Sequence, residues 1–209
     1  MKSVLIADDH PVVRAAVKLV LMQEGFKRIY QASCGNEVLP MIREHSPDLV
    51  VLDLVMPSLD GLDVLARIAS SDMPCRVLVF TSQEPMFFQE RCMRAHAAAY
   101  VSKTNDLEHL HKAVHAVMAG YTYFAQLPSS SVSLNALQRS EKQMVDTLSD
   151  RELTILQYLA RGISNKLIGE TMNLSHKTVS TYKTRVIDKL KVKSAVHLRD
   201  FALRNHLIE

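Results

Sequence analysis

Short apolar runs alternate with stretches of helical periodicity through residues 1–120 of the chain. Near-continuous apolar runs are typical of strands buried on both faces of a parallel sheet. Apolar residues spaced three and four positions apart, as in Val12, Ala16, Leu19 and Val20, are typical of helices with one buried face. The pattern predicts strands over 3–7, 27–32, 48–52, 76–80 and 97–101, each followed by a helix: 11–24, 36–45, 61–69, 85–95 and 107–119.

Regular alternation of strand and helix predicts an α/β domain with a doubly wound, five-stranded parallel (βα)5 sheet. We assign it residues 1–122. The second predicted helix contains Pro40, which removes a backbone hydrogen bond and is expected to kink the helix or cost it stability.

The pattern changes after Gly120. Residues 123–147 contain a polar, serine-rich stretch with Pro128, which is typical of a linker. Part of 135–147 has helical character, but we keep the whole segment as linker. Residues 148–209 then predict a small all-α domain of four helices, in which Ser149 and Glu152 form a capping box and Ser164, Ser175 and Ser194 cap the later helices.

Charge is distributed unevenly between the two predicted domains. Residues 1–124 carry a net charge of −2, whereas residues 145–209 carry +4, so we expect the second domain to meet a polyanion. The three cysteines form no C-x-x-C motif and indicate reduced thiols in a cytoplasmic protein. Met1-Lys2 leads directly into a predicted strand, and no stretch is apolar enough to span a membrane, so we expect neither a leader nor membrane insertion.

Five polar residues stand where four predicted strands end: Asp8, Asp9, Asp53, Thr81 and Lys103. The carboxyl ends of parallel strands meet at one edge of a sheet, where open α/β folds bind ligands. Three carboxylates there would repel one another unless a divalent cation such as Mg²⁺ lay among them. A cation, a reactive carboxylate, a lysine and a hydroxyl together predict a site for a phosphoryl group.

The predicted helix 176–190 has one apolar and one polar face. With 100° per residue, Val186 and Leu190 fall within about 20° of Val179 and form the inward face. The opposite face carries short hydroxyl groups and cations, which suit a DNA major groove because they meet base edges and phosphates. The helix before it and the turn 172–175 complete the spacing of a helix-turn-helix.

Both domains resemble one family, the bacterial response regulators of the NarL/FixJ type with a LuxR-type helix-turn-helix. In the first domain the resemblance rests on Asp8-Asp9-His10-Pro11, Asp53-Leu-Val-Met-Pro57, Asp60-Gly61, Thr81-Ser82 and Tyr100-Val-Ser-Lys103. In the second it rests on Leu148-Ser-Asp-Arg-Glu152, Gly162-Ile-Ser-Asn-Lys166, Lys177-Thr-Val-Ser180 and Lys189-Leu190.

The resemblance implies a role for each residue of the first site. Asp53 would accept a phosphoryl group from the phosphohistidine of a sensor histidine kinase, and Lys103 would pair with a phosphoryl oxygen. Thr81 would hydrogen-bond the group, and Tyr100 would change rotamer as the Thr81 loop moves. Mg²⁺ would be held by Asp8, Asp9, Asp53 and the carbonyl of Val55.

The resemblance also implies a homodimer that reads paired half-sites on double-stranded promoter DNA, joined through the final helix at 194–204, with RNA polymerase as a candidate further partner. The implied base-facing residues are Ser180, Thr181 and Thr184. The implied phosphate contacts are Asn165, Lys166, Lys177, Thr178 and Lys183. Leu167 and Tyr182 depart from the family pattern, which usually has Glu and His there.

Two other functions stay open on the sequence. An aspartyl phosphotransfer enzyme fits the first domain, but Val55 stands where such an enzyme would carry a second carboxylate, and a basic helix-turn-helix has no role in it. A DNA-binding regulator whose receiver only dimerises would fit a degenerate site, whereas the five polar residues are all present.

Overall fold

The computed structural model describes residues 2–71, 73–104, 107–125, 136–192 and 194–208. The chain divides into two compact units, residues 1–126 and 127–209. Among the described residues, no helix combines the length and apolar character needed to cross a membrane.

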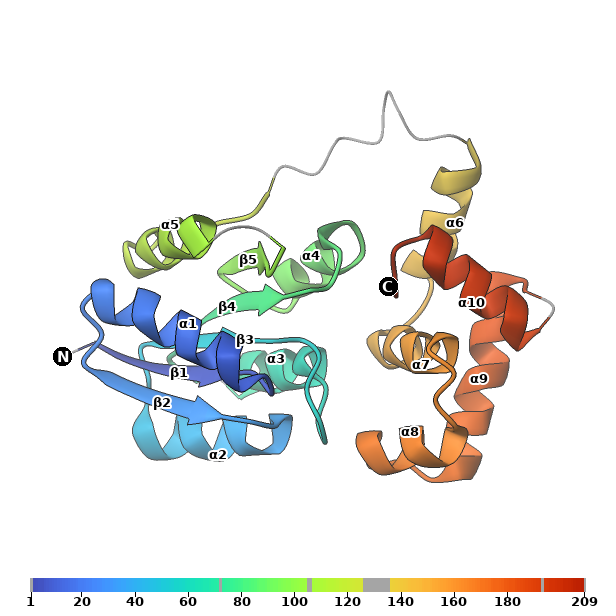
Figure 1. Cartoon of the computed structure of the whole chain (residues 1–209), viewed down its shortest axis with the longest axis horizontal. Coiled ribbons are helices and arrows are strands. Elements are labelled where there is room, and N and C mark those ends of the chain that lie inside the picture. Colours follow the sequence, from blue (N-terminus) through green and yellow to red (C-terminus); the bar gives the residue numbers. More distant parts are fainter. Residues whose placement is uncertain (1, 72, 105–106, 126–135, 193, 209) are drawn as a thin grey trace. The chain divides into compact units, whose positions relative to one another are not determined.

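The first unit is the predicted parallel sheet with helices on both faces (Figure 1). Its strands are β1 (Ser3–Ala7), β2 (Arg28–Ala32), β3 (Leu49–Leu52), β4 (Arg76–Thr81) and β5 (Ala99–Ser102). All neighbours pair in parallel, in the order β2-β1-β3-β4-β5. The helices are α1 (Pro11–Gln23), α2 (Gly35–His45), α3 (Gly61–Ser70), α4 (Pro85–Arg94) and α5 (Leu107–Met118). The order reverses at β1, so ligand chemistry is expected outside the carboxyl ends of β1 and β3.

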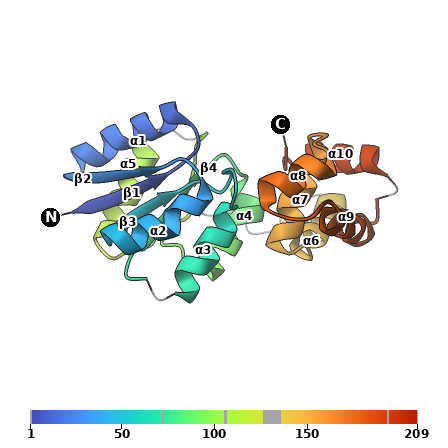
Figure 2. The same ribbon diagram turned by 90° about the horizontal axis from the view of Figure 1, so that it is seen from below.

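Strand burial explains why the apolar runs lacked alternation. β1, β3 and β5 are buried along their whole length, because α1 and α5 cover one face of the sheet and α2, α3 and α4 the other (Figure 2). Alternate strand residues such as Ile6 and Val51 pack with Val17 of α1 and Val114 of α5 in one core cluster. Pro40 is tolerated inside α2, which runs without interruption to His45.

The second unit contains α6 (Ala136–Asp146), α7 (Asp150–Ala160), α8 (Asn165–Met172), α9 (His176–Leu190) and α10 (Ala195–Arg204). Ile155 of α7, Ile168 of α8 and Val179 of α9 form its core cluster. The α8–α9 turn is tight, since Leu174 donates its N–H to the Gly169 carbonyl at 2.7 Å. A Cβ at Gly169 would lie 2.6 Å from the Leu174 carbonyl oxygen, so the close approach of backbone requires glycine.

Three of the four predicted serine caps are confirmed. Ser149 and Glu152 form the capping box, and the hydroxyls of Ser164 and Ser175 accept the N–H groups of Leu167 and Thr178. The prediction for Ser194 is wrong: it occupies the N-cap position without capping the backbone. Its hydroxyl lies 2.7 Å from Nδ1 of His197 instead, and this side-chain contact competes with the cap.

The structure extends both units into the segment 123–147. Tyr123 exchanges backbone hydrogen bonds with Ala98 and Tyr100 beside β5, and Gln89 of α4 bonds to both the N–H and carbonyl of Ala125. At the other end, α6 adds a fifth helix to the second unit. Its Glu141 carboxylate accepts hydrogen bonds from Arg204 and Asn205 at 2.8 and 2.7 Å. These partners are distant in sequence, so local composition gave no sign of them.

Candidate phosphoryl site and DNA interface

The carboxyl ends of the strands bring all five predicted residues to the same edge of the sheet. Asp8 follows β1 and Asp53 follows β3, and each is only 2% exposed. Thr81 is the last residue of β4 and is fully buried, while Lys103 follows β5. Backbone pairing continues past the strands, because the Lys103 N–H donates to the Thr81 carbonyl at 2.7 Å.

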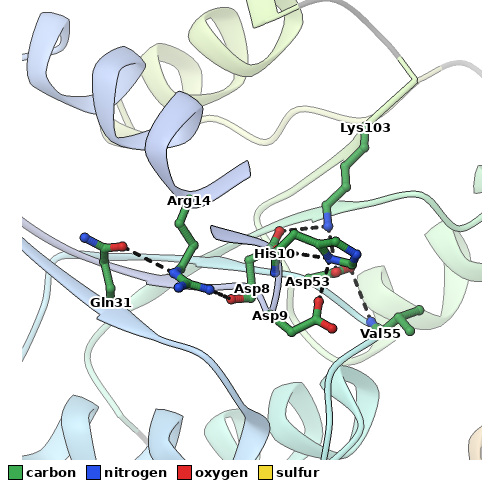
Figure 3. A network of polar contacts seen from close by, with 8 residues as sticks. All are labelled: Asp8, Asp9, His10, Arg14, Gln31, Asp53, Val55 and Lys103. Atoms are coloured by element: carbon green, nitrogen blue, oxygen red, sulfur yellow. Dashed lines mark hydrogen bonds and ion pairs between the residues drawn. The ribbon is translucent and has the colours of Figure 1, made fainter. Parts of the chain in front are cut away.

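Lys103 bridges two of the carboxylates. Its Nζ lies 2.7 Å from Oδ2 of Asp8 and 2.7 Å from Oδ2 of Asp53 (Figure 3). Burial raises the pKa of the Asp53 carboxyl, against the opposing charge of Lys103 and with a further increase from Asp8. Burial alone would lower the pKa of the Lys103 ammonium, but the two carboxylates outweigh burial and raise it. Lys103 is therefore a fixed positive charge at the acidic site.

Backbone N–H groups hold the other carboxylate oxygens. Oδ1 of Asp8 accepts the N–H of His10 at 2.9 Å, and Oδ1 of Asp53 accepts the N–H of Val55 at 3.2 Å. Arg14 of α1 donates to the Asp8 carbonyl at 2.7 Å. The predicted metal ligand at Val55 is its carbonyl, whereas the bond to Asp53 uses the N–H of the same residue.

Gly61, the first residue of α3, lets the loop after Asp53 pass directly beneath the site. Its N–H donates to the Leu54 carbonyl at 2.9 Å, and a Cβ would lie 2.3 Å from the Asp53 carbonyl oxygen. Any larger residue would move the backbone that positions Asp53. The preceding Asp60 caps α3 by accepting the Leu62 N–H at 2.9 Å.

The acidic cluster can hold a metal ion. Ligand atoms of Asp8, Asp9, His10 and Asp53 all lie within 4.8 Å of one another. This separation is close to that of donor atoms that each lie about 2.1 Å from one metal ion. Oδ1 of Asp9 is buried without a hydrogen-bond partner, although Nδ1 of His10 lies 2.6 Å away. The contact is close but lacks hydrogen-bond geometry. A buried oxygen without a donor is what a cation would satisfy.

Thr81 and Tyr100 meet at one residue of the loop after β4. Oγ1 of Thr81 accepts the Gln83 N–H at 3.4 Å, and the Tyr100 hydroxyl donates to the Gln83 carbonyl at 2.8 Å. Tyr100 is 2% exposed, and its burial raises its pKa well above 10.0. The neutral phenol is thus an internal hydrogen-bond donor that ties β5 to this loop.

In the second unit, α9 has the two faces predicted from its sequence. Val179, Val186 and Leu190 are buried. Of the predicted DNA contacts, Lys166, Lys177, Ser180, Thr181 and Thr184 are exposed, and Asn165, Thr178 and Lys183 are half-buried. Thr181 and Thr184 donate to the carbonyls one turn back, those of Lys177 and Ser180. Their hydroxyl oxygens keep acceptor capacity, and their methyl groups are available for apolar contact.

Two residues near these sites are not among the predicted site residues. His10 stands next to Asp9 in sequence, a position that could have identified it. Arg185 is exposed on α9 with its guanidinium 5.8 Å from the centre of the Tyr182 ring, which is within reach of a cation–π interaction. The half-buried Tyr182 packs against the core cluster of this unit.

Comparison with known proteins finds two family models. Residues 4–115 match the response regulator receiver domain, and residues 146–202 match the bacterial regulatory proteins of the luxR family. BvgA of Bordetella pertussis, a virulence-factor regulator, is 48% identical over 204 residues, which are 98% of each chain. The response regulator GacA of Pseudomonas aeruginosa is 34% identical over 211 residues, covering 100% of this chain and 99% of GacA.

A solved structure of the Salmonella typhimurium RcsB response regulator has the same fold, with a TM-score of 0.76 at 22% identity. The match covers 98% of this chain and 99% of RcsB. A receiver domain implies a sensor kinase as partner, and a LuxR-type domain binds DNA. The chain therefore belongs to the two-component response regulators of the NarL/FixJ type, and it is a DNA-binding regulator rather than an enzyme.

Proposed function

We propose that the protein is a transcription factor switched by phosphorylation of Asp53, in the presence of Mg²⁺, from the phosphohistidine of a sensor kinase. The observation that carries the proposal is Lys103 Nζ at 2.7 Å from the carboxylates of both Asp8 and Asp53 at the ends of β1 and β3. A buried carboxylate at Asp53, the fixed cation of Lys103 and the two further acids at the same edge of the sheet support phosphoryl transfer to Asp53.

In this chemistry a carboxylate oxygen of Asp53 forms a bond to phosphorus while the phosphorus–nitrogen bond to the histidine breaks. The imidazole leaves with the electron pair of that bond and takes up a proton. Asp8, Asp9, Asp53 and the Val55 carbonyl would hold Mg²⁺, which would supply positive charge for the phosphoryl oxygens. Lys103 pairs with one of those oxygens, and the Thr81 hydroxyl turns from Gln83 to donate to another.

Labelling with acetyl phosphate tests the acceptor. Wild-type protein is expected to take up one phosphoryl group in Mg²⁺ and none in EDTA, and Asp53→Asn to take up none. Asp63→Asn is the matched control, because Asp63 lies on α3 outside the acidic cluster. Labelling of Asp53→Asn at the wild-type level would refute the assignment and favour a receiver that acts without phosphorylation.

For the DNA-binding half, we propose that α9 enters the major groove with Ser180, Thr181 and Thr184 toward the bases. Asn165, Lys166, Lys177, Thr178 and Lys183 contact phosphates. A homodimer joined through α10 would read two half-sites in the cytoplasm, with RNA polymerase as a candidate partner at the promoter. The exposed Leu203 of α10 and the polar exposed face of α9 support this arrangement.

Two substitutions on α9 separate phosphate contacts from base contacts. Lys183→Ala is expected to weaken binding to every sequence and to reduce the slope of log affinity against log salt by about one ion. Thr184→Ala is expected to change sequence preference at one position of each half-site. An unchanged salt slope would remove Lys183 from the interface, and a uniform loss across sequences would remove Thr184 as a base contact.

A further inference from the structure

We propose that His10 is an additional ligand of the metal site, through Nδ1, and that it gives the site a preference for Mn²⁺ and later first-row divalent ions over Mg²⁺. The inference rests on the proposed function, because it concerns the ion that acts beside Asp53. The inference goes beyond the proposed function because it adds a nitrogen donor to a set of oxygen donors.

The first observation is where the imidazole lies. Nδ1 of His10 is 2.6 Å from Oδ1 of Asp9 and 3.5 Å from Oδ1 of Asp8, and Figure 3 shows the ring beside the carboxylates of Asp9 and Asp53. The side chain is 66% exposed, so no packing forces this orientation.

The second observation is that the His10 ring faces the carboxylates without serving as a cap of α1. His10 is the N-cap residue of α1, but its side chain makes no capping hydrogen bond. Ser, Thr, Asp and Asn are the residues that normally serve this position. The helix start is served by Pro11 at its first position, which needs no donor partner.

The third observation is that the Oδ1 and Oδ2 atoms of the carboxylates have different partners. Lys103 takes the Oδ2 atoms of Asp8 and Asp53. The Oδ1 atoms of Asp8 and Asp53 each accept one backbone N–H, and each keeps a further lone pair. Among the described residues, none donates a hydrogen bond to Oδ1 of Asp9. An ion at the Oδ1 atoms would therefore lie close to Nδ1 of His10, which is 2.6 and 3.5 Å from two of them.

The donor set decides the metal. Carboxylates suit Mg²⁺ and Mn²⁺ alike, whereas an imidazole nitrogen suits the first-row transition ions, whose affinity rises from Mn²⁺ towards Cu²⁺. Mg²⁺ keeps several waters and takes one or two carboxylates, so it gains little from His10. The three aspartates alone would discriminate weakly, and His10 would provide most of the discrimination.

Electron paramagnetic resonance of Mn²⁺ tests this on full-length protein stripped of metal. Wild-type protein is expected to show nitrogen-14 coupling in the echo envelope of bound Mn²⁺, and His10→Gln to lose it. The ratio of Mn²⁺ to Mg²⁺ affinity should fall by about tenfold or more in His10→Gln, since even the residues that support metal ligands contribute about 10–100-fold. His115→Gln is the control, because His115 is 79% exposed on the same unit.

A wild-type spectrum without nitrogen coupling, or an affinity ratio in His10→Gln within about twofold of wild type, would overturn the role of His10. Mg²⁺-dependent labelling of wild-type Asp53 by acetyl phosphate is measured in parallel. If labelling occurs while the His10 result is negative, only this inference fails. If labelling is absent, the proposed function fails independently of His10.

Discussion

Lys103→Met isolates the electrostatics of the acidic site from its packing. Lys103 is 14% exposed on its side chain and bridges two carboxylates that are almost fully buried. Methionine keeps the length and apolar stem of lysine but removes the charge, so the three acids lose the cation that offsets their repulsion. The variant should therefore be unstable without metal and should recover when a divalent cation replaces the lost charge.

The expected magnitude follows from the burial of the pair. Removing one partner of a buried ion pair costs about 3–5 kcal/mol, and the exposed fraction of Lys103 places the loss near the lower end, about 3 kcal/mol. A ligand at 100 times its dissociation constant adds about 2.7 kcal/mol of stability. Mg²⁺ at that excess should thus restore most of the loss. Its stabilising effect should be larger in the variant than in wild type, where Lys103 competes for the carboxylates.

The pH dependence gives a second check with a definite sign. The pKa of Asp53 is raised in the folded protein, above the ordinary value of 3.8. Protonated Asp53 therefore contributes stability that is fully present below pH 3.8 and is lost as the pH rises through the raised pKa. Without Lys103 the pKa of Asp53 rises further. The deficit of Lys103→Met in EDTA should therefore grow as pH rises from 3.8 through that raised value.

Hydrogen exchange measured by mass spectrometry on peptides from β1 and β3 reports the first unit within the full-length protein. Lys112→Met is the matched control, because Lys112 forms an exposed pair with Glu108 and should cost about 0–1 kcal/mol. An equal deficit for Lys103→Met in EDTA and in saturating Mg²⁺ would refute the electrostatic reasoning and make Lys103 a packing residue.

The remaining predictions concern one residue in each unit. Glu152→Gln should destabilise the second unit by about 1–3 kcal/mol, because the buried carboxylate accepts the Ser149 N–H at 2.7 Å and Lys189 Nζ at 2.6 Å. Burial opposes these bonds but they outweigh it and lower the pKa of Glu152 below 4.5. The stabilisation from these bonds is therefore fully present above pH 4.5 and is lost as the pH falls through the pKa of Glu152 in the folded protein. Urea unfolding from pH 3 to 7 should show a free energy of unfolding that depends less on pH in the variant than in wild type. Gly61→Ala should cost about 1–3 kcal/mol and weaken Mg²⁺ binding, because its Cβ would displace the Asp53 carbonyl; calorimetric titration giving wild-type Mg²⁺ affinity would contradict this.

Sequence patterns were sufficient where the signal is local. The apolar runs before Asp8 and Asp53 predicted buried parallel strands, and the carboxyl ends of such strands coincide in space whatever the helices do. The buried face of α9 followed from the spacing of Val179 and Val186. The burial pattern of each element depends on neighbours within that element, and the general rules of parallel sheets then place the strand ends together.

The misses involve side-chain choices or contacts between distant segments. Ser194 has the residue type of a cap, but its hydroxyl has His197 as a competing partner. The region around α6 is polar and gave only a weak helical pattern, whereas Val145 is fully buried and Glu141 bonds to residues more than 60 positions away. The direction of the His10 ring is likewise a rotamer choice made by the carboxylates, which composition cannot report.

Gln83 connects the two proposed switch residues, Thr81 and Tyr100. Its N–H is held by Thr81 and its carbonyl by Tyr100, so both proposed switch residues bind the same peptide segment from opposite sides. The contact to Thr81 is the longer, at 3.4 Å against 2.8 Å, and a charged phosphoryl oxygen is a stronger partner for the Thr81 hydroxyl. If the Thr81 hydroxyl moved to that oxygen, its contact with Gln83 would be lost. Of these two contacts, the hydrogen bond from the buried Tyr100 hydroxyl would then be the one that still holds Gln83. Because an unpaired buried phenol is costly, we expect Tyr100 to follow the Gln83 carbonyl or to turn toward water if this segment moves.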